Sequence, residues 1–162
     1  MNLTLDTDVV VFGLIEPEIC RHIYKEKYPE FVSLHKKAEQ IFKSIVNGKN
    51  NLIIPVSVLI EISAVVSRIT NDKDDGITAS DFTRKYSQII YLDPAFSDYC
   101  IENSANTKIS GFDAVVLSTG MLYDSTLITN DRKFYNNITH YGEVDSYLLS
   151  TMNEDEVNTI SK

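Results

Sequence analysis

Short apolar segments of strand length alternate along this chain with longer segments of helical periodicity. The strand candidates are residues 3–5, 52–54, 89–92 and 126–129. The clearest helical pattern runs from Leu34 to Val46, where apolar residues repeat at helical spacing and lysines occupy the opposite face. Strands that alternate with helices form mainly parallel sheets with helices on both faces. The alternation therefore predicts an α/β fold, with three α/β/α layers around a sheet of four to five short strands.

Other elements follow from local signals. Further helices are predicted at residues 57–69, from an N-cap at Ser80, at 95–107, at 111–123 and directly after Asp131. A weak strand is predicted near residues 138–141. Because no repeat or Pro/Gly-rich linker interrupts the pattern, we expect one domain over residues 1–148 and a polar C-terminal tail over residues 149–162.

The composition limits the class of protein. The chain has 162 residues, a formal net charge of −8 and 43% hydrophobic residues, which is typical of a globular domain. The acidic balance argues against broad electrostatic binding to DNA, but not against an enzyme whose carboxylates bind cations. No apolar run approaches the roughly 20 residues that span a bilayer, and the N-terminus lacks a secretion signal. The two cysteines, Cys20 and Cys100, fit a reducing compartment, so we expect a cytoplasmic protein without membrane contact.

Two acidic residues follow the first predicted strand, and a third lies in an apolar helix. Asp6 ends the strand, at the edge where parallel sheets carry their sites, and Asp8 follows closely. A turn-forming role is the structural alternative for Asp6. Glu61 has apolar neighbours on both sides, and a buried carboxylate is costly unless it is paired or binds a cation. The alternatives for Glu61 are a salt bridge to Arg68 or an exposed stripe shared with Ser57 and Arg68.

Two further acids stand where predicted helices start. Asp113 follows Ser110 at the spacing of a capping box, and Asp131 precedes the last predicted helix. Helix capping explains each of them alone. Together with Asp6 and Glu61, however, they form a set of acids from separate segments, which indicates a cation site. Oxygen ligands select hard ions such as Mg²⁺ or Mn²⁺, and the three scattered histidines form no zinc pattern.

In four places, and in the same order, the sequence resembles the motifs of PIN-domain nucleases. The stretch Leu-Thr-Leu-Asp-Thr-Asp that ends at Asp8 resembles the family's opening, although Asp8 stands where the family most often has Asn. Residues 54–61 resemble its strand followed by a helix with a Glu, and the Asp-Ala pair at Asp113 resembles the start of a later helix. Residues 129–134, Thr-Asn-Asp-Arg-Lys-Phe, resemble its last acidic motif. The matches cover about residues 1–145, and the length is most similar to VapC-type toxins of toxin–antitoxin pairs.

The resemblance implies a Mg²⁺- or Mn²⁺-dependent ribonuclease that hydrolyses RNA phosphodiester bonds. It implies that the catalytic and metal-binding residues are Asp6, Glu61, Asp113 and Asp131, with support from Asp8, Thr7 and Thr129. The ion would activate a water molecule and stabilise charge on the transition state. The resemblance further implies a homodimer and an antitoxin partner. It also places Asp113 beside Asp6, which the predicted strand order alone does not do.

Two other interpretations of the same residues stay open. Residues 6–10, Asp-Thr-Asp-Val-Val, match the D-x-D-x-[TV] motif of haloacid-dehalogenase-like phosphatases, in which Asp6 would be the nucleophile. That family also has a late G-D-x-x-x-D motif, whereas Arg-Lys-Phe-Tyr follows Asp131, and Glu61 would have no role. The other alternative is an inactive PIN-like scaffold that only binds a partner, which the retention of all four acids disfavours.

Overall fold

The computed structural model describes residues 1–109 and 111–162, which contain one five-stranded sheet. Neighbouring strands are all parallel, and their spatial order is β3-β2-β1-β4-β5. The strands are β1 (Asn2–Leu5), β2 (Asn51–Pro55), β3 (Ser87–Ile90), β4 (Thr126–Thr129) and β5 (Ser146–Leu148). The predicted parallel sheet of short strands is confirmed.

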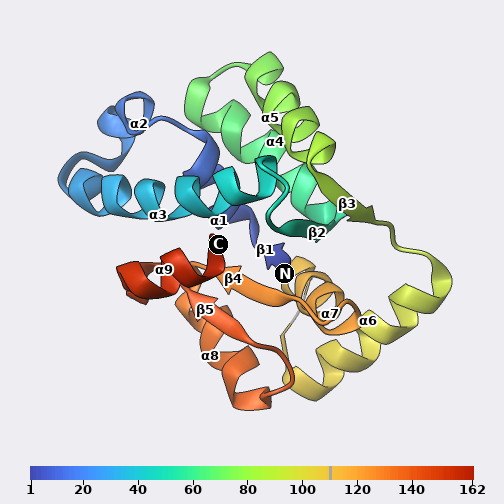
Figure 1. Cartoon of the computed structure of the whole chain (residues 1–162). Coiled ribbons are helices and arrows are strands. Elements are labelled where there is room, and N and C mark those ends of the chain that lie inside the picture. Colours follow the sequence, from blue (N-terminus) through green and yellow to red (C-terminus); the bar gives the residue numbers. More distant parts are fainter. Residues whose placement is uncertain (110) are drawn as a thin grey trace.

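Helices cover both faces of this sheet, as Figure 1 shows. They are α1 (Thr7–Leu14), α2 (Pro17–Tyr24), α3 (Tyr28–Val46), α4 (Val56–Thr70), α5 (Lys73–Lys85), α6 (Pro94–Thr107), α7 (Phe112–Leu122), α8 (Arg132–Tyr141) and α9 (Glu154–Ile160), with 3-10 turns η1 (Lys25–Lys27) and η2 (Leu149–Thr151). The chain first builds the sheet outward from β1 to β3 and then returns to β4 and β5. Because such crossovers are right-handed, α1 to α5 lie on one face and α6 to α8 on the other. The three-layer α/β/α fold is therefore confirmed.

The central strands are buried between the two helical layers. Leu3 and Leu5 of β1, Ile54 of β2, and Leu127 and Ile128 of β4 have no exposed surface. Strands that are apolar on both faces are typical of a parallel sheet covered on both sides. The polar residues that directly follow β1 and β4 are therefore held at the edge of a rigid core. None of the helices within the described residues combines the length and the apolar character needed to cross a membrane.

The prediction that Ser80 starts a helix is wrong. Helix α5 already begins at Lys73, and its N-cap is Asp72, whose carboxylate accepts the Asp74 N–H at 2.8 Å. Ser80 is buried inside this helix. The first turns of α5 contain Gly76 and few apolar residues, so hydrophobic periodicity does not reveal them.

Two predicted strands also differ from the structure. The strand predicted at 89–92 lies earlier in the chain, because β3 ends at Ile90. The weak strand predicted at 138–141 is wrong, since these residues complete α8. This helix buries Ile138 and is capped by Gly142, which adopts φ 75°. The fifth strand instead follows this helix, and its three residues are too few to show a pattern in the sequence.

Residues 149–162 were expected to form a polar tail but pack against the rest of the protein. Asn153 and Glu156 form a reciprocal capping box at the start of α9. Val157 and Ile160 are each 3% exposed and belong to the main apolar core, where α9 lies against α3. Two apolar residues on one face are enough to dock a short helix, even though the segment is polar on average.

Candidate active site

A hollow of about 300 Å³ opens at the carboxyl edge of the sheet. Five acidic residues line it: Asp6, Asp8, Glu61, Asp113 and Asp131. The remaining lining residues are Thr7, Ala64, Val65 and Arg68. The acids that the sequence analysis singled out therefore lie around one hollow, and they come from both helical layers.

Asp6 is fixed between the two central strands. Its backbone N–H donates to the carbonyl of Ile128 in β4 at 2.9 Å. One carboxylate oxygen, Oδ1, accepts the Thr7 N–H at 2.7 Å, which makes Asp6 the N-cap of α1. The other oxygen, Oδ2, accepts the hydroxyl of Thr129 at 2.7 Å. The local role of Asp6 is thus a helix cap, where the sequence suggested a turn, and a second contact joins Asp6 to the end of β4.

The surroundings of Asp6 disfavour its charged form. Burial raises the pKa of Asp6 to about 7, and the carboxylates of Asp8 and Asp113 add to the rise. The hydrogen bonds from Thr129 and Thr7 act in the opposite direction, but burial dominates. A carboxyl group with a pKa near neutrality, lying in a hollow, is typical of a functional site, because a cation placed beside it would restore the ionised form.

Glu61 reaches the same hollow from α4. Its Oε2 accepts the Thr7 hydroxyl at 2.6 Å, which ties α4 to the first turn of α1. Glu61 is half-buried, because α4 buries only one face and exposes residues such as Ile60, which is 59% exposed. Arg68 lies on the face of α4 that lines the hollow, but no salt bridge joins these two described side chains. The sequence suggested an exposed stripe of Ser57, Glu61 and Arg68. In the structure Glu61 and Arg68 line the hollow, whereas Ser57 is buried.

Asp131 is held at the start of α8, in the other helical layer. Its Oδ1 accepts the Phe134 N–H at 2.9 Å, which confirms the predicted capping role. Its own N–H donates to the Thr129 Oγ1 at 3.0 Å. Since the same hydroxyl donates to Asp6, Thr129 links the two acids through a buried side chain.

Asp113 lies in the first turn of α7 and is exposed at the hollow. The N-cap of this helix is Gly111, which adopts φ 62° and offers no side chain. The predicted capping box places a cap at Ser110, which lies outside the described residues. No hydrogen bond from the described residues binds the Asp113 carboxylate, which lines the hollow.

Burial and mutual repulsion raise two further pKa values in this hollow. Burial raises the pKa of Asp113, and the charges of Asp131 and Glu61 raise it further, while Lys133 lowers it. The pKa of Asp8 is raised as well, first by the partial loss of solvent around its carboxylate and then by the charges of Asp131 and Glu61. The neighbouring acids therefore make it harder for Asp6, Asp8 and Asp113 to ionise, and a cation between them would relieve this repulsion.

The donor set of the hollow fits a hard divalent cation by its chemistry. All candidate ligands are carboxylate oxygens, which Mg²⁺ and Mn²⁺ prefer. Among the described residues, no three His, Cys, Asp or Glu side chains already stand in a coordinating arrangement. Ion binding would therefore require side-chain rotations. Asp6 is held by two hydrogen bonds, whereas Asp8 and Asp113 are exposed.

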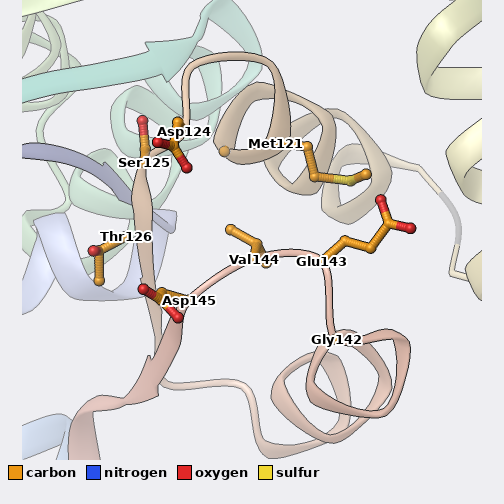
Figure 2. Close-up of a pocket in the computed structure, with 9 residues that line it drawn as sticks. Met121, Asp124, Ser125, Thr126, Gly142, Glu143, Val144 and Asp145 are labelled. Carbon is orange, nitrogen blue, oxygen red and sulfur yellow. The ribbon is translucent and has the colours of Figure 1, made fainter.

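A second hollow, of about 220 Å³, lies at the opposite edge of the sheet, where β4 and β5 begin (Figure 2). Its acidic lining residues are Asp124, Glu143 and Asp145. Figure 2 shows these side chains spread around the rim, with Glu143 on the far side from the other two. They do not converge on one point, and this edge lies at the amino ends of the strands. The carboxyl edge is therefore the better candidate for the active site.

Two features of the hollow were not apparent from the sequence. The bond between Thr7 and Glu61 joins residues 54 positions apart, and nothing in the sequence links them. The second feature is the place of Arg68 in the lining of an acidic hollow. Its spacing of two helical turns from Glu61 predicts a shared face of α4 but not this hollow.

Comparisons with known proteins give a family match and several similar solved structures. A family model of the PIN domain matches residues 30–138. One similar structure is VapBC2 from Rickettsia felis bound to a DNA fragment from their promoter, with 20% identity over 91% of this chain and 98% of that chain, and a TM-score of 0.56. Another is VapBC-1 from nontypeable Haemophilus influenzae, with 13% identity over 93% of this chain and 100% of that chain, and a TM-score of 0.56.

A search among curated proteins finds no significant match. At identities this low, the two similar structures establish a shared fold. The family match, in contrast, spans more than half of the residues and includes Glu61, Asp113 and Asp131. The chain therefore belongs to the PIN domain family, whose members are typically nucleases.

Proposed function

We propose that this protein is a metal-dependent endoribonuclease that hydrolyses RNA phosphodiester bonds. The observation that carries the proposal is the hollow at the carboxyl edge of the sheet. Five carboxylates line it, and one of them, Asp6, is held between β1 and β4. Carboxylates alone would repel an RNA backbone, and their raised pKa values reflect the same unfavourable concentration of charge. A bound cation resolves both problems, which is why the proposal includes Mg²⁺ or Mn²⁺ as cofactor.

The residues of the hollow have distinct roles in this proposal. Asp6 and Asp113 bind the cation directly, and Glu61 and Asp131 complete the acidic set. The hydroxyl of Thr129 orients Asp6. A divalent cation bound here would lower the pKa of an attacking water and stabilise charge on the phosphate. The hydroxyl of Thr7 likewise orients Glu61, through a hydrogen bond that also fixes α4 against α1.

The partners proposed for this nuclease follow from the same assignment. The similar structures are VapBC complexes, which supports a role as the toxin of a type II toxin–antitoxin pair, with an antitoxin protein as partner. We also propose a homodimer and a cytoplasmic location. Both cysteines are free thiols, which fits a reducing compartment.

The first test is the cleavage of labelled single-stranded RNA. We expect cutting with Mg²⁺ or Mn²⁺, none with EDTA, and a loss of at least about a hundredfold in Asp113→Asn, because a residue that stabilises transition-state charge contributes on that order. The matched control is Asp98→Asn, an exposed acid on α6 outside the hollow, which should cut like the wild type.

The same assay separates the alternatives. Hydrolysis of p-nitrophenyl phosphate without RNA cleavage would favour the phosphatase, in which Asp6 is the nucleophile. Folded, partner-free protein that does neither would favour the inactive scaffold. In both cases the ribonuclease proposal would be abandoned.

Cation binding should depend on pH. We expect millimolar Mg²⁺ to raise the unfolding temperature more at pH 8 than at pH 6. Protons and the cation compete for Asp6, whose pKa is about 7, so most of its carboxyl groups are protonated at pH 6 and ionised at pH 8. Thermal unfolding with and without Mg²⁺ at both pH values measures this. Equal shifts at the two pH values would contradict direct binding to Asp6.

A further inference from the structure

Arg68 brings the positive charge of this hollow. Glu61, Ala64, Val65 and Arg68 all line the hollow from α4, and their spacing of three, four and seven residues puts them on one face of that helix. No other basic residue among the described ones belongs to the lining. The arginine is exposed, so its guanidinium is open to solvent at the rim of the acidic surface.

The guanidinium is not engaged by the acids around it. The one salt bridge within residues 1–109 and 111–162 joins Lys43 to Glu39 on α3, and Arg68 donates no hydrogen bond to any described residue. The positive charge that lowers the pKa of Asp113 is Lys133 on α8 rather than Arg68. An arginine that lies beside five carboxylates without pairing with one of them keeps all five N–H donors available.

We propose that Arg68 binds a phosphate of the RNA backbone next to the bond that is cut. This inference rests on the proposed ribonuclease function. A guanidinium binds a phosphate through two parallel hydrogen bonds, which gives both attraction and a fixed orientation. Without such a group, the acidic hollow would attract the RNA only at the cation. Arg68 supplies a second anchor and thereby sets how the strand lies across the hollow.

The test compares Arg68→Ala and Arg68→Lys in the full chain with wild type and with Arg84→Ala. Arg84 is an exposed arginine in the last turn of α5, outside the hollow, and serves as the matched control. The substrate is one single-stranded RNA oligonucleotide that the wild type cuts, and KM and kcat are measured over a series of salt concentrations. Circular dichroism and thermal unfolding check that each variant is folded.

We expect Arg68→Ala to raise KM about tenfold while kcat stays within about twofold, because one charge-assisted phosphate contact is lost. The slope of log KM against log salt should fall by about 0.7, the value for one phosphate contact on a single strand. Arg68→Lys should lie between wild type and Arg68→Ala, because it keeps the charge and loses the two-pronged geometry.

Two results would overturn the inference alone: an unchanged KM and salt slope in Arg68→Ala, or a fall in kcat with KM and slope unchanged. The latter would assign Arg68 to the positioning of the carboxylates. If neither wild type nor Arg84→Ala cuts any RNA, the proposed function fails, and the inference fails with it.

Discussion

Replacing Asp6 by Asn should abolish RNA cleavage and, at the same time, make the folded protein more stable at neutral pH. The two effects have opposite signs because they arise from the same buried charge. Asp6 lies at the carboxyl edge of the sheet, where the proposed cation binds, so the loss of its charge should lower cleavage by at least about a hundredfold. Its burial, however, costs folding free energy whenever the carboxylate is ionised.

The side chain of Asn can keep both contacts of Asp6 if the Thr129 hydroxyl turns from donor to acceptor. Its carbonyl oxygen can accept the Thr7 N–H as Oδ1 of Asp6 does. Its amide can donate to the hydroxyl oxygen of Thr129, which has a second lone pair besides the one that accepts the Asp131 N–H. The substitution therefore removes the charge and keeps both contacts, but it takes away the acceptor that Asp6 offers to the Thr129 O–H.

The sign of the pH dependence follows from the pKa of Asp6. The folded value, about 7, lies above the ordinary value of 3.8, so between these two pH values the folded protein holds a proton that the unfolded chain has released. The contribution of Asp6 to stability therefore falls as pH rises from about 4 and reaches its full cost above pH 7. Asp6→Asn removes this loss, so the stability difference between variant and wild type should grow over the same range.

Urea unfolding in EDTA at pH 5 and pH 8 measures this difference. We expect the free energy of unfolding of Asp6→Asn to exceed that of wild type by about 1–3 kcal/mol at pH 8 and by clearly less at pH 5. This range follows from about 1.4 kcal/mol for each unit of pKa difference, and it is smaller than the full sum because solvent reaches the half-buried group. Asp98→Asn on α6 is the control and should show no such trend. If Asp6→Asn were less stable than wild type at both pH values, the ionised Asp6 could not be destabilising the folded protein.

The sequence predicts the parts of this molecule that have a strong periodic signal. The strands around Leu5 and Ile54 are short and mostly buried and apolar. The helix that starts after β2 carries Glu61 at a position where an apolar pattern is interrupted. These features identify the fold class and place Asp6 and Asp131 at the ends of strands. Because strand ends in a parallel sheet share one edge, the proximity of these two acids is also predictable.

The position of Asp113 is not predictable in the same way. It lies at the start of α7, which enters after β3 and α6 and packs against β1 and β2, so tertiary packing rather than strand order brings it to the hollow. The motif resemblance places it there because members of one family share the same packing, so a matching motif takes the same position in the fold. The packing of the C-terminal segment is not predictable for a related reason. Val157 and Ile160 belong to the core where α9 contacts α3, which lies more than a hundred residues away in the chain.

The start of α5 is not predictable from the sequence, because the residue that packs most closely against α4 there is a glycine. Gly76 lies where α5 crosses α4, and a Cβ atom there would collide with the carbonyl oxygen of Ser63 and the hydroxyl of Ser67. In a sequence, a glycine counts against a helix. In the structure it is the residue that lets two helices approach closely, and α4 is the helix that presents Glu61 and Arg68 to the hollow.

Gly76→Ala is therefore expected to destabilise the protein by about 3 kcal/mol, measured as the free energy of unfolding in urea. The backbone carbonyl of Ser63 cannot rotate away, so α4 and α5 must move apart and lose part of their buried contact. The matched control is Gly120→Ala in α7, where the new methyl group would meet Leu127 and Val144 at 3.5 Å, an ordinary contact distance. There the helix preference of alanine should make the protein slightly more stable, by up to about 1 kcal/mol. Equal effects at the two glycines would show that helix propensity, and not the crossing of α4 and α5, explains Gly76. A loss confined to Gly76→Ala would mean that this crossing sets the position of the helix from which Glu61 and Arg68 reach the site.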